Sequence, residues 1–185
     1  MPKEAGDEDE RAQRFRAAAL PYLDDVFTLA RYLLRNAADA EDAAQECYLR
    51  ALHHFDSYRG PAMKPWLLAI LKNVCNAEFA RRSRSPATNG GNEDAMTPEV
   101  VPLWQEAEAS PEIALATKQG DATLGRLIAS LPPVFREVIV LREINELSYQ
   151  EIAEVAGVPV GTVMSRLARA RAMLRDAWTA ADEGP

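Results

Sequence analysis

The sequence predicts an all-α protein of two small helical domains joined by a flexible acidic linker, with a helix-turn-helix in the C-terminal domain. Apolar residues recur at intervals of three and four along most of the 185 residues, which is the period of a helix, and no segment reads convincingly as a strand. Between Ser83 and Pro111 the sequence is rich in Pro, Gly, Asn and acidic residues, which interrupts the helical pattern. Near the C-terminus, a Gly and a Pro separate two helical segments at helix-turn-helix spacing.

Composition indicates a globular protein of the cytoplasm. Hydrophobic residues make up 48% and charged residues 26% of the chain, which is enough for a core. No apolar run approaches the ~20 residues of a membrane span, so we expect no membrane insertion, and the acidic start "MPKEAGDEDE" is unlike a secretory signal. Cys47 and Cys75 have no neighbouring Cys or His, so we interpret them as reduced core residues, with a disulfide between them left open. We expect no metal, no cofactor and no enzymatic site.

The apolar pattern sets the expected boundaries. Helices are expected approximately over residues 12–35, 39–55, 64–83, 112–130, 133–144, 148–156 and 160–178. The expected organisation is an acidic disordered tail (1–11), a helical domain (12–84), the linker (85–111), a helix-turn-helix domain (112–180) and a short tail (181–185).

The segment "DAEDAAQECYLRALHHF" predicts a helix with an acidic docking face. Asp39 is interpreted as its N-cap, with Asp42 in the capping-box position. One stripe is apolar and is expected to be buried: Ala44, Cys47, Tyr48, Ala51 and Phe55. The opposite side gathers acidic and polar residues around an apolar one: Asp42, Gln45, Glu46, Leu49 and His53. Capping does not account for Glu46, so this face is interpreted as a docking surface for a basic partner.

The segment "YRGPAMKPWLLAILKNVCNAEFARRSR" is basic, with Glu78 as the single acid between Arg59 and Arg84. Its expected core stripe is Leu67, Ile70, Leu71 and Val74, and Lys72 and Asn76 point away from that stripe. Cations and amides beside an aromatic ring are typical of a platform for unpaired bases. Trp66 is interpreted as mainly a core residue on the flank of this platform. The preceding loop, "SYRGPAMKP", is stiffened by Pro at both ends and could receive an extruded base.

The linker carries acidic residues and no Lys or Arg after Arg84. It is either a solvated tether or a segment whose charge imitates a nucleic-acid backbone inside a basic channel. Val100, Val101, Leu103 and Trp104 are unusually apolar for a tether, which favours docking.

The segment "YQEIAEVAGVPVGTVMSRL" predicts the helix-turn-helix. Ala153 is small enough for a close helix crossing, and Gly157 can adopt the left-handed conformation that ends a helix. Pro159 prevents the first helix from continuing, while Val158 and Val163 pack beneath the turn. The second helix could then enter a major groove.

The last helix concentrates positive charge in a chain whose formal net charge is −7. Its core stripe is Val163, Leu167, Ala170 and Leu174, and the far side carries hydroxyl and guanidinium groups. Thr162, Ser165, Arg166 and Arg169 are candidates for base contacts, and Arg171 and Arg175 are candidates for phosphate contacts. A favourable interaction with the helix macrodipole would explain Arg171 and Arg175 but not Arg166 and Arg169.

Three stretches in this order resemble the extracytoplasmic-function (ECF) group of bacterial RNA polymerase sigma factors. They are "DAEDAAQE", then "PWLLAILKN" followed by "RR", and "LPPVFREVIVLREINELSYQEIAEVAGVPVGTVMSRLARAR". The resemblance covers about Leu20 to Trp178. Members often carry an acid where Ala77 stands, so the contacts of that helix to DNA are open in detail.

The resemblance implies that the chain binds core RNA polymerase and directs it to promoter DNA, double-stranded and melted, under the control of an anti-sigma factor. It implies polymerase binding by Asp39, Asp42, Gln45, Glu46 and Leu49. It implies downstream-element contacts by Arg59, Lys64, Trp66, Lys72, Asn73, Asn76, Arg81 and Arg82. It implies upstream-element contacts by Thr162, Ser165, Arg166, Arg169, Arg171 and Arg175. The alternatives are a sigma-mimicking protein that sequesters an anti-sigma factor and an ordinary helix-turn-helix regulator.

Overall fold

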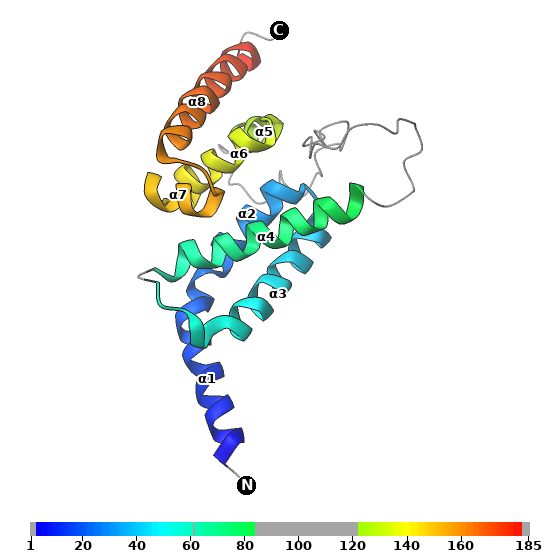
Figure 1. Ribbon diagram of the computed structural model, residues 1–185. Helices are drawn as coiled ribbons and strands as arrows, with labels where there is room; N and C mark the ends of the chain where they lie inside the picture. Colours follow the sequence, from blue (N-terminus) through cyan, green and yellow to red (C-terminus); the bar gives the residue numbers. More distant parts are fainter. Residues whose placement is uncertain (1–2, 61, 84–121, 183–185) are drawn as a thin grey trace, which may run out of the picture.

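A computed structural model describes residues 3–60, 62–83 and 122–182, and within these ranges every regular element is helical (Figure 1). In chain order the elements are α1 (Lys3–Ala19), the 3-10 turn η1 (Leu20–Tyr22), α2 (Leu23–Leu34), α3 (Ala37–His54), the 3-10 turn η2 (Phe55–Ser57), α4 (Met63–Ser83), α5 (Ala122–Ser130), α6 (Pro133–Ile139), the π-helical η4 (Val140–Ile144), α7 (Tyr149–Ala156) and α8 (Val160–Asp182). The predicted all-α class is confirmed. The linker, with its apolar residues 100–104, and residues 112–121 lie outside the described residues.

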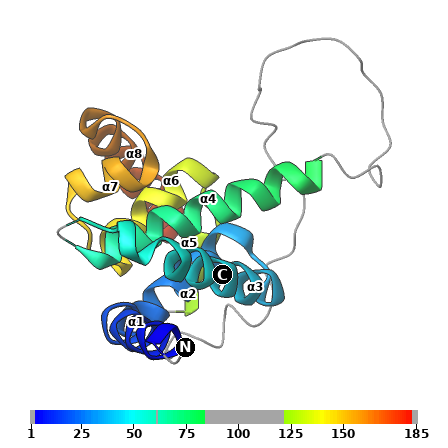
Figure 2. The same cartoon turned by 60° about the horizontal axis from the view of Figure 1, so that its bottom comes forward.

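The helices form two groups, an N-terminal half (α1–α4) and a C-terminal half (α5–α8), that pack against each other. In the N-terminal half, α3 packs on both α2 and α4, and in the C-terminal half α8 packs on α6 and α7. The halves meet where α4 lies along α7 and α2 lies along α6 (Figures 1 and 2). No helix among the described residues has the length and apolar character needed to cross a membrane.

The apolar stripes expected from the sequence form the core. Cys47, Ala51, Leu67 and Leu71 are buried in the N-terminal half, and Val163, Leu167 and Ala170 are buried in the C-terminal half. Both cysteines are free thiols, so no disulfide joins Cys47 to Cys75. Burial raises the pKa of each thiol to about 12, so neither is reactive near neutral pH.

The N-terminal expectations were wrong in two respects. The single helix predicted over 12–35 is divided by η1, because Pro21 lacks the backbone N–H that a continuous helix needs. Residues 3–11, expected as a disordered tail, belong to α1. Arg11 holds this helix in place by donating to the Leu52 carbonyl at 2.7 Å and pairing with Asp56 at 2.8 Å.

The start of α3 also differs from expectation. Asn36, rather than Asp39, is the N-cap, and its side-chain oxygen accepts from the Asp39 backbone N–H at 3.0 Å. The helix therefore begins two residues earlier than predicted, and the capping box with Asp42 does not form. Because Asn36 caps the helix, the Asp39 carboxylate is available for another partner.

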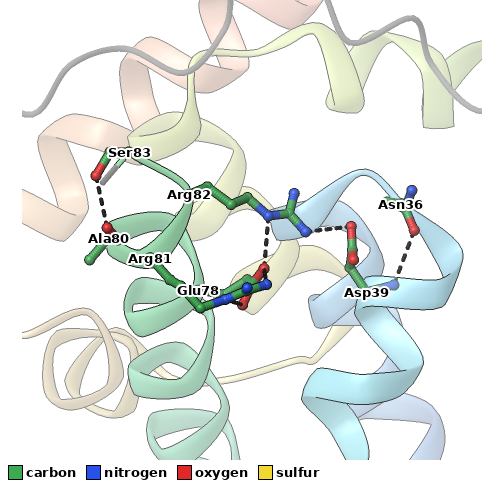
Figure 3. Close-up of polar contacts among 7 residues, drawn as sticks. All are labelled: Asn36, Asp39, Glu78, Ala80, Arg81, Arg82 and Ser83. Atoms are coloured by element: carbon green, nitrogen blue, oxygen red, sulfur yellow. Dashed lines mark hydrogen bonds and ion pairs between the residues drawn. The ribbon is translucent and has the colours of Figure 1, made fainter. Parts of the chain in front are cut away.

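That partner is Arg82, which fastens the end of α4 to the start of α3 (Figure 3). Arg82 lies 2.6 Å from the Asp39 carboxylate and 2.8 Å from that of Glu78. Arg81 donates two hydrogen bonds to Glu78, at 2.9 and 2.7 Å. Hydrogen bonds from Arg81 and then Arg82 lower the pKa of Glu78 to about 2.

The turn of the helix-turn-helix forms as the sequence predicts. Gly157 ends α7 with φ 66° and ψ 36°, and the Val158 N–H donates to the Ala153 carbonyl at 3.1 Å. Ser148 begins α7 with a capping box to Glu151, a feature that the spacing Ser-x-x-Glu could have revealed.

Replacing Gly157 with alanine should lower the free energy of unfolding by about 1 kcal/mol, because a side chain disfavours this left-handed conformation. No atom lies within 4 Å of the added Cβ, so no clash should add to that cost. Gly161→Ala is the matched control: the position is helical and equally open, so it should raise stability by about 0.5–1 kcal/mol. Urea unfolding followed by circular dichroism measures both, and changes of the same sign would contradict the assignment.

Glu78→Gln should reduce stability at neutral pH by about 0.5–1 kcal/mol, the range of partly exposed ion pairs. The pKa of Glu78 is lower in the folded protein than its ordinary 4.5, so its contribution is complete above pH 4.5 and disappears as the pH falls through about 2. The difference in unfolding free energy between the wild type and the variant should therefore shrink with acidification. A difference that stays constant down to about pH 2 would argue against this network.

Candidate nucleic-acid interface

The solvent face of α8 carries the predicted base-contacting residues. Burial of Val163 and Leu167 turns this face outward, so that Ser165 and Arg169 are exposed and Thr162 and Arg166 are half-buried. The guanidinium groups of Arg166 and Arg169 form no hydrogen bond or ion pair with any residue that the structure describes. They are therefore available to an external anion or base edge.

The two arginines predicted to contact phosphate differ from each other. Arg175 is exposed, and its guanidinium has no partner within the described parts of the chain. Arg171 pairs with Glu143 of η4 at 2.7 Å, and the hydrogen bonds that its guanidinium makes with Glu143, as donor, and with Tyr149 raise its pKa. Arg171 therefore joins α8 to η4 in this conformation.

The predicted platform on α4 is partly exposed and partly covered. Asn73 and Asn76 are exposed, whereas Trp66 is half-buried with its ring 4.7 Å from that of Tyr58. Lys72 is occupied: its ammonium lies 2.5 Å from Glu137 and donates to the Ala156 carbonyl at 3.0 Å. The C-terminal half therefore covers the part of this face that carries Lys72.

The remaining cations of this half also have partners. Lys64 pairs with Asp25 of α2 at 2.9 Å, and Arg59 donates to the Asp56 and Tyr58 carbonyls. Arg82 is held by Asp39 and Glu78, while Arg81 pairs with Glu78 but remains 76% exposed. The predicted downstream-element residues therefore share one half of the molecule, but several must exchange a partner to contact DNA.

The predicted docking face lies on α3. Asp42, Gln45 and Leu49 are exposed, Leu49 to 64%, and Glu46 pairs with Arg50 on the next turn at 2.6 Å. Asp39, at the start of this helix, faces Arg82. An exposed acid and an exposed leucine therefore lie on one helix face, as the sequence predicts.

This face continues into a shallow open groove between α1 and α3. The groove has a volume of about 400 Å³ and is lined by Ala12, Phe15, Arg16, Leu20, Gln45, Tyr48, Leu49 and Leu52. The sequence interpretation missed the contribution of α1. Leu20 is 50% exposed in the folded chain, and no local sequence pattern marked it as a surface residue. Among the described residues, no three His, Cys, Asp or Glu side chains lie together as metal ligands would.

Comparison with known proteins matches both halves to one family. Residues 19–85 match Sigma-70 region 2, and residues 122–174 match Sigma-70 region 4. The RNA polymerase sigma-H factor of Pseudomonas aeruginosa is 36% identical over 169 residues, which cover 88% of this chain and 87% of that protein. The ECF RNA polymerase sigma factor SigW of Bacillus subtilis is 35% identical, with 83% of each chain covered. The ECF RNA polymerase sigma-E factor of Escherichia coli is 34% identical over 88% of this chain and 84% of the relative.

Solved structures share the fold. The sigma factor RpoE, in complex with the anti-sigma factor NepR from Bartonella quintana, matches with a TM-score of 0.68 at 24% identity over 90% of this chain and 98% of that one. CnrH, in complex with the cytosolic domain of CnrY, matches with a TM-score of 0.63 at 23% identity over 95% and 94%. With two matched regions and relatives aligned over most of their length, this chain belongs to the ECF group of RNA polymerase sigma factors.

Proposed function

We propose that this chain binds core RNA polymerase through α3 and directs it to promoters by two DNA-contacting surfaces. The observation that carries the proposal is the separation of charge. An exposed acidic and apolar face on α3 and an unpaired cationic face on α8 belong to different halves of one chain. An acidic face suits a basic protein surface, and a cationic face suits phosphate and base edges.

The upstream promoter element is read by α8 in the major groove. The N-terminal turns of a recognition helix contact base edges, and here they carry Thr162, Ser165 and Arg166 on the solvent side. Arginine can bond both acceptors of a guanine, which gives Arg166 and Arg169 the capacity for direct readout. Arg175, farther along the helix, is suited to a phosphate contact.

The downstream element is captured by α4 and the loop before it. Asn73 and Asn76 present amides to unpaired base edges, and Trp66 and Tyr58, whose rings lie 4.7 Å apart and are tilted by 40°, offer aromatic surface. Gly60 lets this loop lie against Tyr58, because a Cβ at that position would come within 2.9 Å of the ring. The remaining contacts come from Lys64, Lys72, Arg59, Arg81 and Arg82 after their present partners are exchanged.

We further propose that an anti-sigma factor regulates this chain and that the chain acts in the cytoplasm. One solved structure with this fold contains the anti-sigma factor NepR, and another contains the cytosolic domain of CnrY. The groove between α1 and α3 adjoins the docking face, so a regulator that covers the groove would also cover Leu49. An anti-sigma sequestering protein would have no need of the unpaired arginines on α8, so that alternative is not favoured.

Arg166→Ala should weaken binding to the upstream element by about 1–3 kcal/mol, because one good base contact is lost. The choice among promoters should change accordingly. Run-off transcription with core polymerase on a promoter library measures the effect position by position. Arg14→Ala on α1 removes an equal charge from an exposed position and should leave the ranking of promoters intact. An unchanged ranking with Arg166→Ala would remove this residue from direct readout.

Leu49→Ala and Asp42→Ala should each weaken binding to core polymerase by more than about 1 kcal/mol, as expected for residues at the centre of an interface. Both side chains are exposed, so the free energy of unfolding should change by less than about 0.5 kcal/mol. Binding is measured by fluorescence anisotropy of the labelled full chain with core polymerase. Leu124→Ala on α5 is the control, because Leu124 is also an exposed leucine but lies in the other half. If all three variants bind equally well, α3 is not the docking face.

A further inference from the structure

Met164 on α8 is the most exposed large apolar side chain that the structure describes in the C-terminal half. It is 54% exposed, compared with 47% for Trp178 and 38% for Met173 on the same helix. A single exposed apolar residue is ordinary on a protein surface, so exposure alone carries no conclusion. Met164 is distinguished by its place, because it lies near the start of α8 next to Ser165 and Arg166, two of the predicted base-contacting residues.

The helix surface around Met164 is formed by small residues. At about 100° per residue, Gly161 lies one turn before Met164 and Ala168 one turn after it, on the same side of α8. Both are exposed, and no atom lies within 4 Å of a Cβ added at Gly161. Small residues let the backbone of a helix come close to another molecule. Met164 is therefore a long side chain between two short ones, on a surface that a partner can approach closely.

The charges beside this surface favour DNA over a protein as the partner. Arg166 and Arg169 have no hydrogen bond or ion pair with a described residue, and Arg175 is exposed on the same flank as Met164. Along α8 no acidic residue precedes Asp176. An anionic partner suits these arginines, and at Met164 the same partner must present an apolar group.

The methyl group of thymine meets both requirements. Base edges in the major groove otherwise present hydrogen-bond donors and acceptors, whereas the C5 methyl group of thymine is apolar. The N-terminal turns of a recognition helix contact base edges, and Met164 lies in the second turn of α8. The thioether side chain is flexible and polarizable, so it can adjust its position to a methyl group that no hydrogen bond fixes.

We propose that Met164 contacts the methyl group of a thymine in the upstream promoter element and determines a preference for an A·T pair at that position. The proposal rests on the proposed insertion of α8 into the major groove. Arg166 and Arg169 form hydrogen bonds and ion pairs, which do not detect a methyl group. Met164 therefore supplies sequence information that these arginines do not.

Selection of promoters from a library tests the preference. The full-length wild type, Met164→Ala and Met173→Ala are each combined with core polymerase, and the bound promoters are sequenced. Met164→Ala should lose about threefold to fourfold in preference for an A·T pair at one position, which is the value of one buried methyl group. Met173→Ala is the matched control, because it truncates another exposed methionine of α8, and it should keep the wild-type preferences. Unchanged preferences in Met164→Ala would overturn the proposal.

Removal of the methyl group from the DNA tests the contact itself. Deoxyuridine replaces each thymine of the selected upstream element in turn, and binding of the chain with core polymerase is measured by fluorescence anisotropy. At one position the replacement should weaken wild-type binding about threefold to fourfold and should not weaken binding of Met164→Ala further. The two changes remove the same contact, so their effects should not add. Equal losses for the wild type and Met164→Ala at every position would contradict the contact.

Two comparisons separate failure of this inference from failure of the proposed function. If Arg166→Ala changes the ranking of promoters and Met164→Ala does not, α8 recognises the element without the methyl contact. If neither variant changes the ranking, the placement of α8 in the major groove is wrong as well. Weaker binding of Met164→Ala to core polymerase in the absence of DNA would assign Met164 to a protein contact and overturn the proposal. The urea midpoint of Met164→Ala should equal that of the wild type, because the side chain is exposed.

Discussion

Burial of one apolar stripe on each helix is the constraint on which the other features of this protein depend. Leu67 and Leu71 on α4 and Val163 and Leu167 on α8 are almost fully excluded from solvent. Each such side chain contributes about 1.5–3 kcal/mol, which exceeds the contribution of any surface ion pair in the molecule. Because these stripes must face inward, the charged residues between them face outward or into the boundary between the halves.

The resulting charges differ from helix to helix in sign and in pairing. On α8 the outward face is cationic and largely unpaired, so the binding of DNA there would break few existing ion pairs. On α4 the cations are matched by carboxylates of α2, α3 and α6: Asp25 for Lys64, Asp39 for Arg82 and Glu137 for Lys72. The cations of the proposed upstream-element surface on α8 are therefore largely free of partners among the described residues, whereas those of the proposed downstream-element surface on α4 are already paired. This difference is consistent with a protein that binds its promoter fully only together with polymerase.

The acidic residues of the N-terminal half also divide between two roles. Asp42 remains exposed on the proposed docking face with Leu49, while Asp39 and Glu78 bind Arg82 and so join the start of α3 to the end of α4. Within the one motif "DAEDAAQE", Asp39 therefore stabilises the packing of α3 on α4, while Asp42 remains on the surface. The groove between α1 and α3 extends that surface onto a helix whose first residues were expected to be disordered.

Local pattern determined most of the helices, their buried stripes and the turn at Gly157, but not the helix over residues 3–11 or the break at η1. These features depend on the 3.6-residue period and on the backbone freedom of glycine, which neighbouring residues reveal. The order of motifs was also sufficient to recognise the family. The N-cap of α3 was mispredicted because Asn36 and Asp39 are both suitable caps, and only their competition in the folded chain decides between them.

Tertiary structure decided which charges are free. Lys72 and Glu137 are far apart in the sequence, as are Asp39 and Arg82, and no local pattern encodes their pairing. An ion pair needs side chains from two packed helices within about 4 Å, and that distance follows from how the apolar stripes of different helices fit together. The sequence could therefore identify the cations suited to DNA, whereas only the folded chain showed that Arg166 and Arg169 are unpaired and that Lys72 is already held.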